Sequence, residues 1–232
     1  MFSNRSAHAP HKNRITLALE QAPPAFDLTE SNPTRTELPY AHAGLLQALD
    51  NAAVRGYAPD PHGLPEARAA VTARYAERGL SVSPDQITVA SGTSEAYGYL
   101  FKLLCDPGDE VLVPEPSYPL FSDLCRLENV LPRPYPLHYD GEWHLGLAEL
   151  AQAVGPRTRA IMLVGPNNPT GSYLKRAELA ALERLGLPLI SDEVFADYPL
   201  RADPERVHSA LESETALVFA LDGLSKQCAL PQ

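Results

Sequence analysis

The sequence predicts an α/β fold: a mostly parallel, doubly wound sheet with helices on both faces, preceded by an N-terminal arm. Short apolar segments alternate with segments of helical periodicity, and the joints between them are short and rich in glycine and proline, a pattern typical of parallel sheets. Residues 160–164 are continuously apolar, as expected of a strand buried on both faces. We therefore expect residues 46–232 to form one large domain and residues 1–45 to form the arm.

The expected elements follow from this alternation. Residues 1–45 are predicted to be irregular because prolines interrupt any long helix there. Helices are expected at 44–55, 64–78, 95–104, 145–154 and 174–185, with another ending near 127. Strands are expected at 86–90, 110–113, 130–137, 160–164, 187–190 and 216–221, and three prolines weaken the third of these.

Composition narrows the possible partners. The net charge is −10 and no basic block occurs, so neither nucleic acid nor a membrane surface is expected as a partner. No apolar run reaches membrane-spanning length. The three cysteines show no CxxC spacing, which predicts reduced thiols in a cytoplasmic protein and no metal site. The basic first 14 residues lack an apolar segment after them, so a flexible arm is favoured over a targeting signal.

Polar clusters follow the expected strands, and ligands of parallel sheets bind beyond the carboxyl ends of the strands. This convergence is the main physical argument for a binding site. The clusters are Gly92-Thr93-Ser94, Ser117-Tyr118, Asn167-Asn168, Asp192 and Lys226.

Each cluster also has an ordinary structural interpretation. Gly92, Thr93 and Ser94 open a helix, where free amides and hydroxyls form a phosphate cradle, but Ser and Thr are also common helix caps. Tyr118, held between two prolines, either stacks on a planar ligand ring or packs as an ordinary loop tyrosine. Asn168 either donates to a ligand oxygen or simply forms a turn.

Two charged residues carry the chemistry if a site exists. Asp192 follows an apolar strand, and a buried carboxylate there requires a partner such as a protonated heterocyclic nitrogen; alternatively it caps a helix. Lys226 follows the last strand, and a desolvated lysine amine can attack a carbonyl. A surface lysine in a loop is the alternative.

Taken in order, these segments resemble the successive signatures of class I/II aminotransferases, which are fold-type I enzymes dependent on pyridoxal 5′-phosphate (PLP). The resemblance covers roughly residues 30–232. The segments that carry it are Tyr57 to Gly63, Gly92-Thr93-Ser94-Glu95-Ala96, Asp106 to Val111, Pro114-Glu115-Pro116-Ser117-Tyr118-Pro119, Asn168-Pro169-Thr170-Gly171, Ser191-Asp192-Glu193-Val194 and Leu224-Ser225-Lys226.

The resemblance implies a role for each residue. Lys226 would form the Schiff base with the cofactor and move the proton, and Asp192 would pair with the pyridinium nitrogen. Asn168 would bond the phenolic oxygen, and Tyr118 would stack on the ring. The phosphate would be held by Gly92, Thr93, Ser94 and Ser225, and by Tyr57 of a second subunit, which implies a homodimer with shared sites. Ser31 and Asn32 would approach the substrate.

The sequence departs from the family pattern in three places. Phe195 stands where the family commonly has a tyrosine that contacts the phenolic oxygen, and Gly223 stands where many members have a phosphate-binding serine. The chain ends at Gln232, before the arginines expected for phosphate and substrate. We therefore expect a PLP-dependent transferase-like large domain with the small-domain segment of the arm but without the C-terminal small domain, in a fragment or truncated product.

Three functions remain open from the sequence. The first is an aminotransferase acting on an amino acid and a 2-oxo acid. The second keeps the cofactor and the fold but is a C–S lyase. The third is a catalytically inactive fragment of the same fold that binds or regulates.

Overall fold

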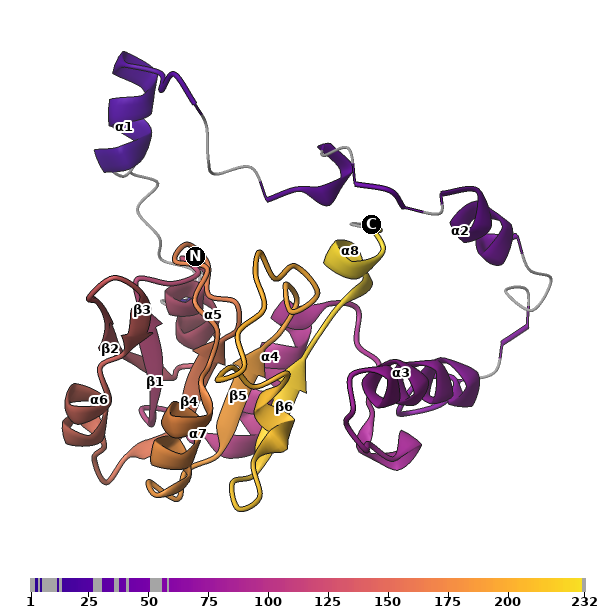
Figure 1. Cartoon of the computed structure of the whole chain (residues 1–232). Helices are drawn as coiled ribbons and strands as arrows, with labels where there is room; N and C mark the ends of the chain where they lie inside the picture. The colour runs from indigo at the N-terminus through magenta and orange to yellow at the C-terminus, as the bar shows by residue number, and fades with distance from the viewer. Residues whose placement is uncertain are drawn as a thin grey trace.

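The computed structural model describes residues 59–230 without a break and, before them, residues 3, 5, 12, 14–26, 31–35, 38–40, 42–50 and 56–57. A six-stranded sheet lies at its centre, with the strand order β3-β2-β1-β4-β5-β6 (Figure 1). All neighbouring strands are parallel except β2 and β3, which are antiparallel. The predicted mostly parallel sheet is confirmed.

The bounds of the elements agree with most of the predicted ranges to within a few residues. The strands are β1 Glu110–Glu115, β2 Leu131–Tyr139, β3 Trp143–Leu145, β4 Thr158–Val164, β5 Leu189–Asp192 and β6 Val218–Leu221. The helices are α1 Arg14–Gln21, α2 His42–Leu49, α3 Pro65–Glu77, α4 Thr93–Leu104, α5 Phe121–Leu127, α6 Leu147–Ala153, α7 Arg176–Glu183 and α8 Leu224–Gln227, with short 3-10 turns η2 Pro33–Arg35, η4 Pro84–Gln86 and η5 Ala210–Glu212.

Helices cover both faces of the sheet, as a doubly wound fold requires. On one face α4 and α5 pack on alternate residues of β1 and β4, among them Val111, Val113 and Met162. On the other face α6 and α7 pack on the intervening residues, among them Leu112 and Ile161. Because successive side chains of a strand point to opposite faces, the continuous apolar run of β4 contributes to both cores.

The alternate spacing of the three prolines in β2 explains how this strand can form although it contains them. Pro132, Pro134 and Pro136 alternate, so their missing amides all face the same edge of the strand. The amide of Leu131 donates to the carbonyl of Asp109 at the other edge, where β1 pairs in parallel. The pairing with β3 begins only at Leu137, just after the last of the three prolines.

Two predictions in the chain were wrong. Residues 86–90 do not form a strand: η4 precedes an extended segment whose Val89 amide donates to the carbonyl of His62. Residues 1–45 are not entirely irregular, because α1 forms between the prolines and α2 begins at His42. The part of the expected helix 44–55 beyond Asp50 lies outside the described residues.

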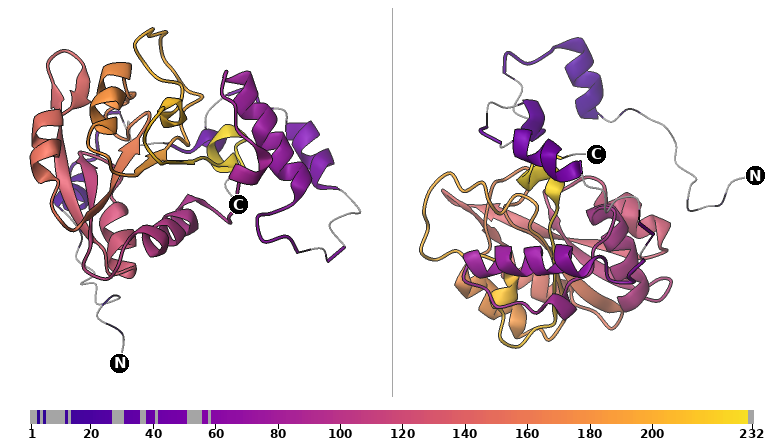
Figure 2. Two further views of the ribbon diagram at one scale, coloured as in Figure 1. Left: turned by 90° about the horizontal axis from the view of Figure 1, so that it is seen from below. Right: turned by 90° about the vertical axis from the view of Figure 1, so that its right-hand side faces the viewer.

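The described segments of the arm lie beyond the end of the sheet at which α8 is found, and α3 lies on the side of β6 (Figures 1 and 2). This position places the arm over the carboxyl ends of the central strands. Among the helices that the structure describes, none has the length and apolar character needed to cross a bilayer.

Candidate active site

Four of the predicted site residues follow or end neighbouring strands at one end of the sheet. Tyr118 follows β1, Asn168 follows β4, Asp192 ends β5 and Lys226 follows β6. These strands are parallel neighbours, so their carboxyl ends lie at one edge. The same edge is where the segments of the arm lie (Figure 1).

Asp192 is a buried carboxylate whose two oxygens are both held. The Tyr97 hydroxyl donates to Oδ2 at 2.7 Å, and the backbone amide of Val194 donates to Oδ1 at 3.2 Å. The residue is 7% exposed, and this burial raises its pKa, whereas the two donors oppose that shift. In the part of the chain that the structure describes, no cation pairs with it.

The first turn of α4 is open to a ligand. Gly92 is its N-cap residue and has an extended φ of 172°. Because glycine has no side chain, no side-chain oxygen caps the helix at this position. Glu95 instead reaches back and accepts from the amide and hydroxyl of Ser91, both at 2.8 Å. An α-helix leaves its first amides without intrahelical acceptors, so the amides near Thr93 and Ser94 suit an anion.

Tyr118 lies half-buried at the edge of the aromatic core. Its ring meets Phe121 edge to face with centroids 5.6 Å apart, and Phe121 meets Tyr97 in the same way at 5.4 Å. Burial raises the Tyr118 pKa, and the charge of Asp192 adds to that shift. Tyr118 therefore lies within electrostatic reach of the carboxylate that it was predicted to accompany.

The two adjacent asparagines have different roles. Asn167 is buried: it accepts from Ser117 Oγ and donates to the Pro116 carbonyl and to Thr170 Oγ1. Asn168 is half-buried, and its side chain bonds no residue that the structure describes. The amide of Asn168 is thus free for a ligand, whereas that of Asn167 holds the loop together.

Lys226 lies on the short helix α8, close to the arm and to Phe195. Its Nζ donates to the carbonyl of Ser31 at 3.0 Å and lies 5.1 Å from the Phe195 ring centroid. The structure therefore brings together the predicted catalytic lysine, a residue predicted to approach substrate, and the phenylalanine that departs from the family pattern.

Two tyrosines that the sequence analysis missed fix the backbone at Lys226. The Tyr198 hydroxyl donates to the Lys226 carbonyl and also contacts the Tyr40 hydroxyl, which itself lies 3.2 Å from that carbonyl oxygen. Tyr40 belongs to the arm, so the arm contacts the α8 backbone as well as the lysine side chain. Tyrosines in loops carry no distinguishing sequence pattern, and only the fold reveals this contact.

The other predicted residues are less closely gathered. Ser225 is half-buried and bonds none of the described residues. Asn32 is occupied with the η2 turn, since its Oδ1 accepts from the amide and the hydroxyl of Thr34. Tyr57 is 95% exposed. The structure of one chain therefore does not bring Tyr57 to the α4 terminus.

A buried ionic cluster, which the sequence analysis also missed, lies behind α8. Arg78 lies 3.6 Å from Glu193 and 3.8 Å from Asp222, and it donates to the His208 carbonyl. Burial raises the pKa of Asp222 to about 7. Asp222 accepts from the Gly223 amide and from Gln227, so the cluster is joined to both ends of α8.

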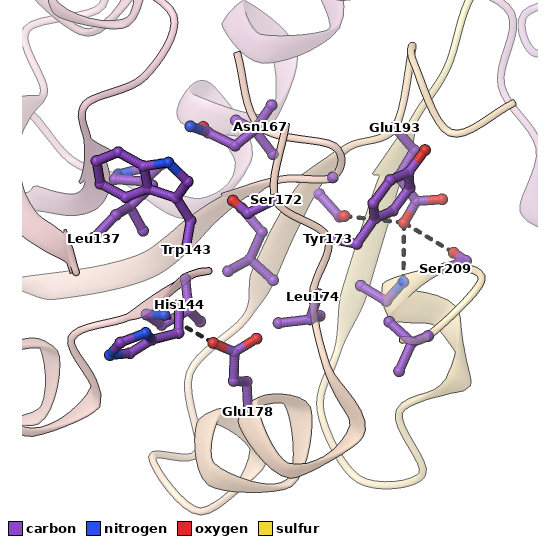
Figure 3. A pocket seen from close by; sticks show the side chains of 18 of the residues that line it. Leu137, Trp143, His144, Asn167, Ser172, Tyr173, Leu174, Glu178, Glu193 and Ser209 are labelled. Carbon is purple, nitrogen blue, oxygen red and sulfur yellow. Dashed lines mark hydrogen bonds between the residues drawn. The ribbon is translucent and has the colours of Figure 1, made fainter. Parts of the chain in front are cut away.

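A hollow on the α6 and α7 face of the sheet contains none of the residues to which the resemblance assigns a role, although Asn167 lines it. Glu193 lies at one side, where Oε1 accepts from Ser191, Ser209 and the Ala210 amide, all at 2.9 Å (Figure 3). Its 30 Å³ of space suits one or two water molecules, not a cofactor.

The residues at the sheet end fit the group that the resemblance implies. A buried carboxylate without a cation needs a positively charged partner, and a protonated pyridine nitrogen is one. An open helix N-terminus suits a phosphate, and the free amide of Asn168 suits an oxygen between them. Lys226, which follows β6, would supply the amine.

Comparison with known proteins gives the same family. The model described as "Aminotransferase class I and II" matches residues 24–232. The chain is 32% identical to the glutamate-pyruvate aminotransferase AlaA of Escherichia coli over 74% of this chain and 43% of the relative. It is 34% identical to the aspartate/prephenate aminotransferase of Thermus thermophilus over 72% of this chain and 46% of the relative.

Solved structures agree in fold. The aspartate aminotransferase of Thermotoga maritima superposes with a TM-score of 0.79 at 26% identity, over 99% of this chain and 63% of that one. The alanine aminotransferase of Pyrococcus furiosus superposes with a TM-score of 0.74 at 28% identity, over 84% of this chain and 51% of that one. The chain spans less than half the length of the curated relatives named above. Members of this family depend on PLP, and this chain belongs to the class I and II aminotransferase family.

Proposed function

We propose that this protein is a PLP-dependent aminotransferase that moves an amino group between an amino acid and a 2-oxo acid, with Lys226 as its catalytic lysine. The observation that carries the proposal is Asp192: a buried carboxylate held by two hydrogen bonds and paired with no cation of the described chain. A ring nitrogen that must stay protonated is the partner that such a carboxylate stabilises.

The other residues act around this contact. When bound, the cofactor supplies an electron sink that stabilises negative charge developing at the substrate α-carbon. The amides at the start of α4 would hold its phosphate, Tyr118 would cover its ring, and Asn168 would donate to its oxygen. Lys226 would hold it through Nζ and would carry a proton to and from the substrate. Ser31, whose carbonyl accepts from Nζ, keeps the arm beside the reacting group.

The names of the relatives favour amine transfer over the C–S lyase alternative, because the relatives from Escherichia coli, Thermus thermophilus, Thermotoga maritima and Pyrococcus furiosus are all aminotransferases. Their named substrates differ, so the proposal stays at the class of amino acid and 2-oxo acid. We also propose a cytoplasmic homodimer. The side chain of Tyr57 supports the dimer because, at 95% exposed, it is available to a second subunit.

Mapping the covalent cofactor bond tests the lysine directly. The chain contains four lysines, Lys12, Lys102, Lys175 and Lys226. After incubation with PLP, borohydride reduction and peptide mapping, we expect the cofactor on Lys226 in the wild-type chain and in Lys102→Ala, and no stoichiometric adduct in Lys226→Ala. Lys102 is a suitable control because it pairs with Glu128 on the outside of α4. A stoichiometric adduct in Lys226→Ala would overturn the assignment.

A second assay tests the reaction. The PLP-loaded 232-residue chain is given an amino acid and a 2-oxo acid, and exchange of the amino group is followed by mass spectrometry with a ¹⁵N label. Transfer of the label to the new amino acid supports the proposal. Release of pyruvate and ammonia from a substrate with a sulfur leaving group, without label transfer, would support the lyase. No turnover at all would support the inactive fragment.

A further inference from the structure

The hydroxyl of Tyr97 contacts the carboxylate on which the proposed function rests. Tyr97 is 1% exposed on α4, and its hydroxyl lies 2.7 Å from Asp192 Oδ2. Thr93, in the first turn of the same helix, is four residues earlier and therefore on the same face. One helix thus carries both the proposed phosphate cradle and the donor to Asp192.

The Tyr97 ring is fixed by packing against two other rings. Phe121 meets it edge to face at 5.4 Å, and Phe101 stacks on it at 6.1 Å with an interplanar angle of 30°. The hydroxyl of a tyrosine lies on the axis of its ring, so fixing the ring fixes the hydroxyl position. Tyr97 is therefore a donor held in a fixed position beside Asp192.

The two donors define the orientation of the carboxylate. Tyr97 bonds Oδ2 and the Val194 amide bonds Oδ1, so the carboxylate cannot rotate about its last bond without losing one of them. Both bonds favour the ionised form and oppose the effect of burial on the Asp192 pKa. Burial and the nearby charge of Asp192 raise the Tyr97 pKa well above its usual value, so the hydroxyl keeps its proton and remains a donor.

A second buried tyrosine shows what an ordinary structural hydroxyl does in this fold. Tyr135, on β2, is also 1% exposed, and its hydroxyl donates to the backbone carbonyl of Met162 at 2.8 Å. A buried hydroxyl needs an acceptor, and a backbone carbonyl is sufficient. Tyr97 instead uses the one carboxylate that the proposed function assigns to the cofactor ring.

We propose that Tyr97 is a positioning residue for cofactor binding: its hydroxyl holds Asp192 ionised and oriented toward the ring nitrogen of PLP. This inference rests on the proposed function, since it assigns Tyr97 a role through Asp192. It adds a residue that none of the sequence patterns singled out.

The first test uses the chain without cofactor. The titration of Asp192 is followed by NMR with ¹³C-labelled aspartate, and Asp192→Asn identifies its signal. We expect Tyr97→Phe to raise the Asp192 pKa by about one unit, because a charge-assisted hydrogen bond to the ionised form is lost. Tyr135→Phe, which loses an equally buried hydroxyl bond elsewhere, should leave it unchanged.

A measurement on the unaltered chain covers the case in which Tyr97→Phe does not fold. The ¹³Cζ shift of Tyr97 should follow the titration of Asp192, with the same midpoint. An independent midpoint, or no change, would overturn the proposal without any variant at Tyr97.

The second test measures PLP binding by absorbance across pH. We expect Tyr97→Phe to raise the apparent dissociation constant by a factor that grows as the pH falls and approaches about tenfold, the equivalent of one pKa unit, below the Asp192 pKa. A wild-type chain that takes up no PLP overturns the proposed function and this role together. Normal PLP uptake combined with an unchanged Asp192 titration in folded Tyr97→Phe, or an equal shift in Tyr135→Phe, overturns the inference on Tyr97 alone.

Discussion

The Nζ atom of Lys226 lies 5.1 Å from the centroid of the Phe195 ring, so a cation faces an aromatic ring where the family pattern commonly places a phenol. Phe195 also meets Tyr198 edge to face at 6.2 Å, and Tyr198 donates to the Lys226 carbonyl. The ring is therefore part of the wall around the lysine, although it has no hydroxyl to offer a ligand oxygen.

Adding that hydroxyl should change the protonation of the nitrogen through which Lys226 binds the cofactor. In Phe195→Tyr, we expect a donor to the phenolic oxygen to weaken that oxygen's interaction with the protonated nitrogen. The absorbance titration of the bound cofactor should therefore move to lower pH by about one unit. Phe26→Tyr, which adds a hydroxyl to an exposed side chain, is the control. An identical titration in Phe195→Tyr would show that Phe195 does not face the cofactor oxygen.

The adjacent asparagines should separate stability from cofactor binding. Asn167→Ala removes three hydrogen bonds of a buried side chain, so we expect it to lower the free energy of unfolding by about 2–3 kcal/mol. Asn168→Ala should change that free energy by less than about 0.5 kcal/mol, because its amide bonds nothing described, but it should weaken PLP binding. Urea unfolding and PLP titration measure the two effects. A large loss of stability in Asn168→Ala would assign it a structural role.

Much of the fold could be predicted because apolar strand segments alternate regularly with helical segments along the chain. The apolar runs of β1, β4 and β5, with helical segments between them, predicted the doubly wound sheet and the edge at which the polar clusters gather. The segment 86–90 was predicted as a strand from the same β-branched pattern. That pattern indicates side chains suited to a strand. A strand also requires a neighbouring strand with which its backbone can form hydrogen bonds. In the described structure the Val89 amide instead donates to the carbonyl of His62, in a loop.

The site could be predicted only in part, for a similar reason. Residues in motifs that follow strands, such as Asp192 and Lys226, were found from their position in the chain. Tyr97, Arg78 and Tyr40 were missed because each acts through a partner at least 90 residues distant in sequence. Such contacts have no local signal, and they depend on how the helices pack.

Arg78 should be costly to remove, because it is the cation of the buried ionic cluster behind α8. Its side chain is 11% exposed and lies between Glu193 and Asp222, so Arg78→Met leaves two buried carboxylates without their cation. We expect a loss of about 3 kcal/mol in the free energy of unfolding at pH 8. Arg74→Met, in the last turn of α3 just before Arg78 but with a side chain that is 42% exposed, should cost less than about 1 kcal/mol. Equal losses in urea unfolding would contradict the buried role of Arg78.

Asp222 should make the protein less stable as the pH rises toward neutrality. Its pKa in the folded chain is raised to about 7 by burial, with Glu193 adding to the shift while the Gly223 amide and Arg78 oppose it. Between about pH 4 and pH 7 the folded chain keeps a proton that the unfolded chain has released. The stabilisation is therefore complete below the unfolded pKa and is lost as the pH rises through 7, with a slope of up to about 1.4 kcal/mol per pH unit.

Asp222→Asn should remove this part of the pH dependence. We expect the free energy of unfolding to vary less between pH 4 and pH 7 than in the wild-type chain, though not to become constant, because burial also raises the pKa of Asp192 and of Glu193. The slope is the informative quantity, since an amide facing Gln227 also changes the hydrogen bond at α8. Asp123→Asn, at a partly exposed pair with Arg126, is the control. An unchanged slope in Asp222→Asn, measured by urea unfolding at each pH, would show that this carboxylate is ionised throughout the range.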